Sequence, residues 1–113
     1  RDFCLSRGLG DVYKRQVYDV LGTGTMTSES VSAALAIAWY CREPMRCAKL
    51  CANLGGDTDT IGAMATAICG AAVGLDGFDQ DTVRYLEETN GLDFRAMAER
   101  IVALRGEFRL GDA

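Results

Sequence analysis

Histidine is absent from the 113 residues of the chain. This excludes imidazole as an acid–base catalyst, as the base of a Ser-His or Cys-His pair, and as a zinc ligand. Chemistry carried by this sequence must therefore use carboxylates, hydroxyls, backbone groups and metal ions that bind oxygen.

Positive charge and long hydrophobic runs are also scarce. The net charge is −4, with 12 Lys and Arg against 16 Asp and Glu. This balance argues against a nucleic-acid partner, because phosphate binding needs clustered basic residues. No apolar run reaches the roughly 18 residues of a membrane span. With no recognisable signal peptide either, we expect no membrane association and a cytoplasmic location.

Cysteine is present five times but in no CxxC pair. The positions are Cys4, Cys41, Cys47, Cys51 and Cys69. Cys47 and Cys51 are four residues apart and would share a helix face, where they could in principle hold a metal. Small buried hydrophobic residues in a reducing compartment are the favoured interpretation.

Residues 1–16, "RDFCLSRGLGDVYKRQ", differ from the rest of the chain in being basic and without a clear hydrophobic period. The last six, Asp11 to Gln16, back-translate as GAT GTG TAT AAG AGA CAG, which resembles the mosaic-end adapter of transposase-prepared sequencing libraries. We therefore predict that 1–16 is a non-native segment that contributes little to the core, and that natural sequence occupies 17–113. A genuine basic N-terminal arm is the alternative.

From residue 27 onward the sequence predicts helices only, so the expected fold class is all-α. Thr27 is expected to cap the first helix, with Met26 and Val31 as a hydrophobic staple. Later helices are expected over Pro44–Leu54, from Asp57–Thr60 to about Gly74, over Gln80–Thr89 after a cap at Asp79, and from Phe94 to about Phe108 after a cap at Asp93. The buried face of the first helix is predicted as Val31, Ala34, Leu35, Ala38 and Trp39.

The helix that follows Asp57 contains few bulky side chains. Glycine inside a helix costs about 1 kcal/mol relative to alanine, so Gly62 and Gly70 need a compensating role. A central helix wrapped on all sides by its neighbours is the simplest account, and packing alone would explain both glycines.

The motif "GGDTDT" contains three side chains with hard oxygen ligands in a stretch of four residues: Asp57, Asp59 and Thr60. Two carboxylates directed at one point are unfavourable unless a cation or a proton lies between them, and Mg²⁺ is an ion that accepts such ligands. A helix cap with an exposed acid is the plain alternative. An EF-hand is rejected, because its fifth and twelfth positions would be Ile61 and Ile68. A D-x-D phosphatase is disfavoured, since its motif follows a buried strand.

A longer match supports the metal hypothesis. "NLGGDTDTIGAMATAICGAAVG" closely resembles the C-terminal metal motif of the ADP-ribosylglycohydrolase family, and "GTGTMTSESVSAALAIAW" resembles the loop and helix that precede it. The resemblance covers Gly22 to Gly74 well and the last two helices loosely. Ser32 departs from the pattern, since many relatives have proline there, which affects helix entry and not the chemistry.

The resemblance implies an all-α, orthogonal helical bundle with two Mg²⁺ ions in a central cleft. It assigns Asp57, Asp59 and Thr60 as metal ligands, with Asp59 touching both ions. It places Gly24 and Thr25 on the adenosine side of the cleft, and Gly55 and Gly56 beside the substrate. The implied reaction is hydrolysis of the N- or O-glycosidic bond that joins ADP-ribose to a protein side chain or a small molecule.

The resemblance also implies a second acidic cluster in the N-terminal half of the family domain, and nothing before Gly22 matches it. The catalytic residues are therefore expected outside this chain, which is predicted to be a C-terminal fragment, inactive alone and prone to self-association through exposed apolar faces. A non-catalytic helical module that retains the motif is the alternative from another functional class.

Overall fold

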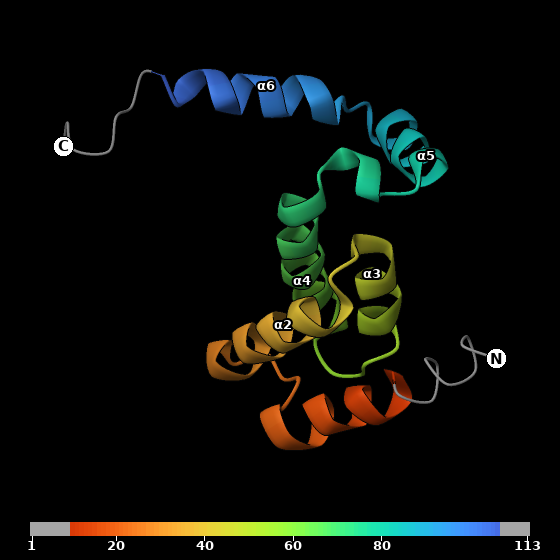
Figure 1. Ribbon diagram of the computed structural model, residues 1–113, viewed down its shortest axis with the longest axis vertical. Helices are drawn as coiled ribbons and strands as arrows, with labels where there is room; N and C mark the ends of the chain where they lie inside the picture. Colours follow the sequence, from red (N-terminus) through yellow and green to blue (C-terminus); the bar gives the residue numbers. More distant parts are fainter. Residues whose placement is uncertain (1–9, 107–113) are drawn as a thin grey trace. The chain divides into compact units, whose positions relative to one another are not determined.

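The structure, a computed structural model, describes residues 10–106. No strand occurs within that range, which confirms the all-α prediction (Figure 1). The chain divides into two compact units, the first ending at Phe78 and the second beginning at Asp79. Within the described range, no helix is long and apolar enough to cross a membrane.

The first unit contains three long helices joined by short connections. Residues 10–16 are α-helical and continue into a π-helical turn. The elements are η1 (Val17–Leu21), α2 (Thr27–Cys41), α3 (Pro44–Ala52), α4 (Thr58–Val73) and the 3₁₀ turn η2 (Leu75–Gly77). Pro44 begins α3 as predicted, because its fixed φ suits the first turn. Gly74 follows α4 with a φ of 80°, a conformation that favours glycine.

The start of α2 differs by one residue from the prediction. Met26 is the N-cap, in an extended conformation, and Thr27 is already the first helical residue. No side chain caps this helix. Met26 is largely exposed, so the expected staple with Val31 is not supported.

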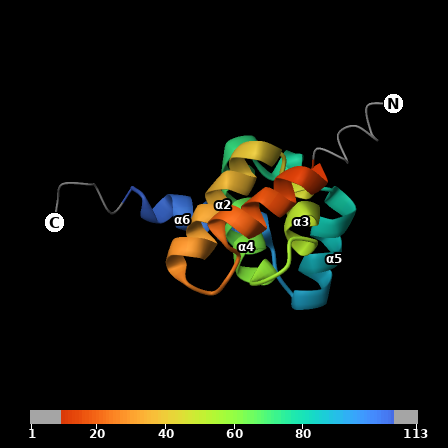
Figure 2. The same cartoon turned by 90° about the horizontal axis from the view of Figure 1, so that it is seen from below.

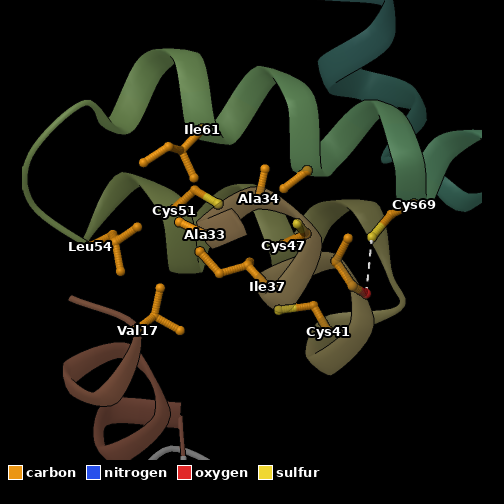
Figure 3. Packing of buried hydrophobic residues seen from close by; sticks show 12 residues of the cluster. Val17, Ala33, Ala34, Ile37, Cys41, Cys47, Cys51, Leu54, Ile61 and Cys69 are labelled. Carbon is orange, nitrogen blue, oxygen red and sulfur yellow. Dashed lines mark hydrogen bonds between the residues drawn. The ribbon is translucent and has the colours of Figure 1, made fainter. Parts of the chain in front are cut away.

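The core of the first unit is made where α2, α3 and α4 pack together (Figures 1 and 2). Ile37 and Ile61 are its largest fully buried side chains and lie close to Leu54 and Cys51 (Figure 3). Most of the other members are alanine or cysteine, whose small volumes let the three helices approach closely. The core consists of Val17, Ala33, Ala34, Ile37, Ala38, Cys41, Cys47, Cys51, Leu54, Ile61, Ala65 and Cys69.

The four cysteines of this core are free thiols, as the favoured interpretation predicted; Cys4 lies outside the described residues. The Cys69 thiol donates to the Ala38 carbonyl oxygen at 3.7 Å, the dashed line in Figure 3. Burial raises the pKa of Cys69 to about 11. Within residues 10–106, no group of three or more Cys, Asp, Glu or His is placed to hold a metal ion. The four thiols are buried in the core and contribute to its packing.

The predicted buried face of α2 was partly wrong. Ala34 and Ala38 are buried, but Val31, Leu35 and Trp39 are exposed. The face that packs instead is centred on Ala33, Ile37 and Cys41, which are four residues apart. Because α2 is apolar on more than one face, its own sequence could not decide which face meets α3 and α4.

The expectation that α4 is wrapped on all sides was also wrong. Its buried residues form a single stripe of Ile61, Ala65 and Cys69, and Ile68 and Val73 are exposed. The two glycines do serve packing. A Cβ at Gly62 would lie 3.3 Å from the Cβ of Cys51 on α3, and one at Gly70 would lie 2.9 Å from the Phe78 ring.

The segment before η1 contacts the core, although 1–16 was expected to contribute little to it. The Tyr13 hydroxyl donates to the Ala36 carbonyl oxygen at 2.7 Å, and the Tyr13 ring stacks on Tyr40 with 4.1 Å between centroids. Val17, one turn later, is part of the core. The non-native origin of residues 1–16 stays a prediction.

The second unit contains α5 (Gln80–Asn90) and α6 (Phe94–Leu104). Both caps were predicted correctly: Asp79 accepts from the Thr82 N–H at 3.2 Å, and Asp93 accepts from the Ala96 N–H at 3.0 Å. Helix α6 ends at Leu104, earlier than expected, and Phe108 lies outside the described residues. Val83 is the one buried residue of these two helices. On α6 the apolar side chains of Met97, Ile101 and Leu104 are exposed.

Candidate metal centre at the start of α4

The two aspartates of the motif lie at the first turn of α4. Asp57 occupies the N-cap position, yet its side chain accepts no capping hydrogen bond. This differs from Asp79 and Asp93, whose carboxylates cap α5 and α6. Capping therefore does not explain the carboxylate of Asp57. The alternative interpretation of the motif, a helix cap with an exposed acid, loses its main support.

The Asp57 carboxyl instead interacts with Asp59. A side-chain hydrogen bond from Asp57, followed by the backbone N–H groups of Thr60 and of Asp59 itself, lowers the pKa of Asp59. Asp57 is half-buried, and Asp59 and Thr60 are exposed. Neither aspartate forms a salt bridge with a basic residue in the described part of the chain. Two adjacent acidic groups thus face solvent without a protein cation to neutralise them.

The turn before α4 requires its two glycines. Gly55 and Gly56 have φ values of 89° and 78°, which side chains on L-residues rarely allow. A Cβ added at Gly56 would overlap the carbonyl oxygen of Thr23. The backbone therefore approaches a second loop more closely than any other residue type would permit.

That second loop is the glycine-rich segment between η1 and α2, residues 22–25. The Asp57 N–H donates to the Thr23 carbonyl oxygen at 2.7 Å, and Thr23 is buried, with 4% of its surface exposed. The structure thus joins the two segments that the resemblance assigned to one site. Gly24 is half-buried and Thr25 exposed in the same loop.

Sequence reasoning missed two residues that build this arrangement. Thr23 fixes the backbone of Asp57, and the Glu29 carboxylate lies so close to Gly22 and Gly24 that a Cβ at either glycine would overlap it. The Gly-Thr-Gly spacing was a usable signal, because two glycines around one residue indicate close contacts on both sides. The partner of Thr23 is 34 positions away, so no local pattern could reveal it.

The oxygen ligands at this site are of the type that a hard cation prefers, but they are too few to hold it alone. Carboxylate and hydroxyl oxygens from Asp57, Asp59 and Thr60 are ligands that Mg²⁺ accepts, and the contact between the two carboxyls is relieved when a cation lies between them. Yet residues 10–106 bring no third acidic side chain to this pair. Further ligands would have to come from water or from protein outside this range.

The surroundings of the motif argue against a phosphatase of the D-x-D type. Such an aspartate pair follows a buried strand, whereas here a helix and a glycine turn precede Asp57 and no strand occurs in the described residues.

Two loops are thus joined at the N-terminus of a small-residue helix, with two acids at its start. The family model for ADP-ribosylglycohydrolases matches residues 3–109, and the chain belongs to this family. No solved structure matches the chain significantly.

Among curated relatives, the uncharacterized protein YegU of Escherichia coli is 52% identical over 91 residues, which are 80% of this chain and 27% of that protein. Human ADP-ribosylhydrolase ARH3 is 38% identical over 76 residues, 58% of this chain and 21% of that protein. Zebrafish ADP-ribosylhydrolase ARH3 is 39% identical over 72 residues, 54% of this chain and 20% of that protein. The chain thus spans about a quarter of the length of the curated relatives it matches.

Proposed function

We propose that the protein to which this chain belongs hydrolyses the N- or O-glycosidic bond of ADP-ribose conjugates with the help of Mg²⁺. The observation that carries the proposal is the pair Asp57 and Asp59. The two acids lie two residues apart at the start of α4, neither caps α4 through its side chain, and neither is paired with a basic residue of the described chain. Membership of the ADP-ribosylglycohydrolase family supports the substrate class.

In this proposal Asp57, Asp59 and Thr60 hold the cation, and Asp59 takes the role that the family resemblance implies, as a ligand of both ions. When bound, Mg²⁺ supplies a template and Lewis acid for the ribose hydroxyls and the attacking water. The rigid N-terminus of α4 keeps the two carboxylates in place, because the Asp57 N–H is bonded to Thr23 and Gly56 lies against the same residue. Rigid placement of ligands matters, since Mg²⁺ tolerates little departure from its preferred geometry.

The substrate would lie beside the two glycine-containing loops. Gly55 and Gly56 leave backbone unshielded by side chains at the turn before α4, and Gly24 and Thr25 belong to the loop bonded to that turn. Backbone N–H groups in such loops are suited to phosphate or ribose oxygens. The catalytic acid or base is not assigned to any residue of this chain, and the 113 residues alone are expected to bind Mg²⁺ weakly and to hydrolyse nothing.

The test is the Asp59→Asn variant of the full-length protein, assayed for free ADP-ribose released from an ADP-ribosylated peptide. We expect turnover to fall by about 100-fold or more, since changes merely next to a metal site already cost 10–100-fold, while the helical circular dichroism spectrum stays unchanged. Asp76→Asn, in the exposed turn η2, is the matched control and should keep full activity. Near-normal turnover of Asp59→Asn at saturating Mg²⁺ would refute the metal assignment.

The same assay separates the hydrolase from a non-catalytic helical module. A full-length protein that binds ADP-ribose but releases none from conjugates, at any Mg²⁺ concentration, would favour the module.

A further inference from the structure

An apolar groove of about 420 Å³ lies between α2 and α4, inside the first unit. Helix α2 contributes Leu35 and Trp39, helix α4 contributes Ile68, Ala72 and Val73, and Arg42 follows the end of α2. None of these residues belongs to the candidate metal centre, which lies at the opposite end of α4 from Val73.

The side chains that line the groove are larger than those of the core beneath it. Trp39 is 75% exposed, Leu35 56% and Ile68 44%. By contrast, the core residues that α2 contributes on its other side are mainly alanine. Contiguous exposed apolar side chains of this size mark a surface that another element covers.

Helix α4 is also shaped for a close neighbour along this groove. Ala72 lines it, Ala71 next to it is exposed, and Cys69 of the buried stripe lines it as well. Small residues on an open helix face allow a second helix to approach to a short interaxial distance.

The groove contains one charged side chain. The Arg42 guanidinium lies 5.0 Å from the centre of the Trp39 ring, and its Nε donates to the Trp39 carbonyl oxygen at 3.3 Å. Arg42 has a φ of 59°, the one positive value outside glycine in the described residues. A strained backbone thus holds a cation at the rim, and a covering helix would gain by placing a carboxylate opposite it.

We propose that this groove binds an amphipathic helix from the part of the family domain that these 113 residues do not contain, with an apolar face on Leu35, Trp39 and Ile68 and a carboxylate opposite Arg42. The curated relatives are about four times as long as the region matched, so they contain further segments from which such a helix would come. A second copy fits less well, because a twofold contact through this groove would bring two Arg42 cations together without an acid.

The proposal can be tested by co-expressing the tagged chain with E. coli YegU from which the matched region has been deleted. Co-expression lets the two parts fold together. Trp39 is the only tryptophan of the chain, so 5-fluorotryptophan gives one ¹⁹F resonance that reports on the groove. We expect a stoichiometric complex in which this resonance is shielded from a soluble paramagnetic agent.

Substitutions in the groove test whether its side chains form the contact with the bound helix. Leu35→Ser and Ile68→Ser should each reduce the recovered complex at least tenfold, and Arg42→Glu should reduce it where Arg42→Lys largely retains it. All these side chains are exposed, so the chain itself should keep its helical spectrum. Val102→Ser, exposed on α6, should leave the complex unchanged.

Three results would overturn the proposal. The first is that no complex is recovered. The second is a complex that forms equally well with Leu35→Ser and Ile68→Ser. The third is a Trp39 resonance of the chain alone that shifts with protein concentration and stops doing so in Leu35→Ser, which would assign the groove to a second copy.

Discussion

The two units of the chain form their helices for opposite reasons. In the first unit α2, α3 and α4 have no side-chain caps, yet they share a core of twelve residues. In the second unit Asp79 and Asp93 cap α5 and α6, yet Val83 is the only buried residue of these helices. Packing therefore stabilises the first unit, whereas local hydrogen bonds define the second. Mutations of core residues and of caps should affect them very differently.

The largest effect is expected from Ile37→Ala. Ile37 is fully buried between helices of the first unit, so truncation leaves a cavity and should cost about 2–5 kcal/mol of unfolding free energy. Ile101→Ala in the second unit removes the same side chain from a site that is 67% exposed, and should change stability by less than about 0.5 kcal/mol. Urea denaturation followed by circular dichroism measures both, and equal losses would remove the contrast between the units.

A second comparison uses two glycines with positive φ. Gly56→Ala must strain the backbone and also displace the Thr23 carbonyl, so we expect a loss of about 2–4 kcal/mol. Gly91→Ala, at the end of α5 with a φ of 63°, meets no atom within 4 Å and should cost only about 1 kcal/mol. The difference measures how firmly the 22–25 loop is joined to the metal motif. Equal costs would show that the two loops are not in contact.

Tyr13 tests the segment whose origin is in question. Tyr13→Phe keeps the ring on Tyr40 but loses the hydrogen bond to Ala36, and should lower stability by about 1 kcal/mol. Tyr85→Phe, on the exposed surface of α5, is the control and should be neutral. If Tyr13→Phe is neutral as well, the hydrogen bond to Ala36 adds no measurable stability, which would agree with the expectation that residues 1–16 contribute little to the core.

The smallest stability effects are expected where an aspartate that caps a helix is compared with one proposed to bind a metal ion. Asp93→Ala should destabilise α6 by about 1 kcal/mol, because its carboxylate satisfies the Ala96 N–H. Asp57→Ala should cost less than about 0.5 kcal/mol, because the Asp57 side chain makes no capping bond and lies next to another acid. Thermal melts of the two variants decide the matter. If Asp57→Ala lowers stability as much as Asp93→Ala does, Asp57 acts as a helix cap and the metal interpretation loses this support.

Local signals in the sequence were enough to predict the helices after residue 27, whereas the helical residues 10–21 were not predicted. Pro44, Asp79 and Asp93 act on neighbours within four residues, and the structure has each of them where it was expected. The end of α6 was placed too late, since no glycine or proline follows Leu104 directly. Helix ends without a strong stop signal are poorly defined by sequence.

Long-range contacts were not predictable. Leu35 and Ile37 are both apolar residues of α2, and only the positions of α3 and α4 decide that Ile37 is inside and Leu35 outside. The motif itself was visible in the order Gly55, Gly56, Asp57 and Asp59. Its attachment to Thr23 was not, because that contact joins two loops through backbone atoms that any residue possesses.

The central claim is that Asp57, Asp59 and Thr60 form a cation site, and Mn²⁺ tests it most directly. The paramagnetic ion can replace Mg²⁺ and broadens the amide NMR signals of nearby residues. The account predicts weak binding in which the signals of residues 57–60 broaden first, recover when excess Mg²⁺ is added, and no longer respond in Asp59→Asn. Broadening centred on another acidic stretch, such as residues 76–81, or undiminished broadening in Asp59→Asn, would contradict it.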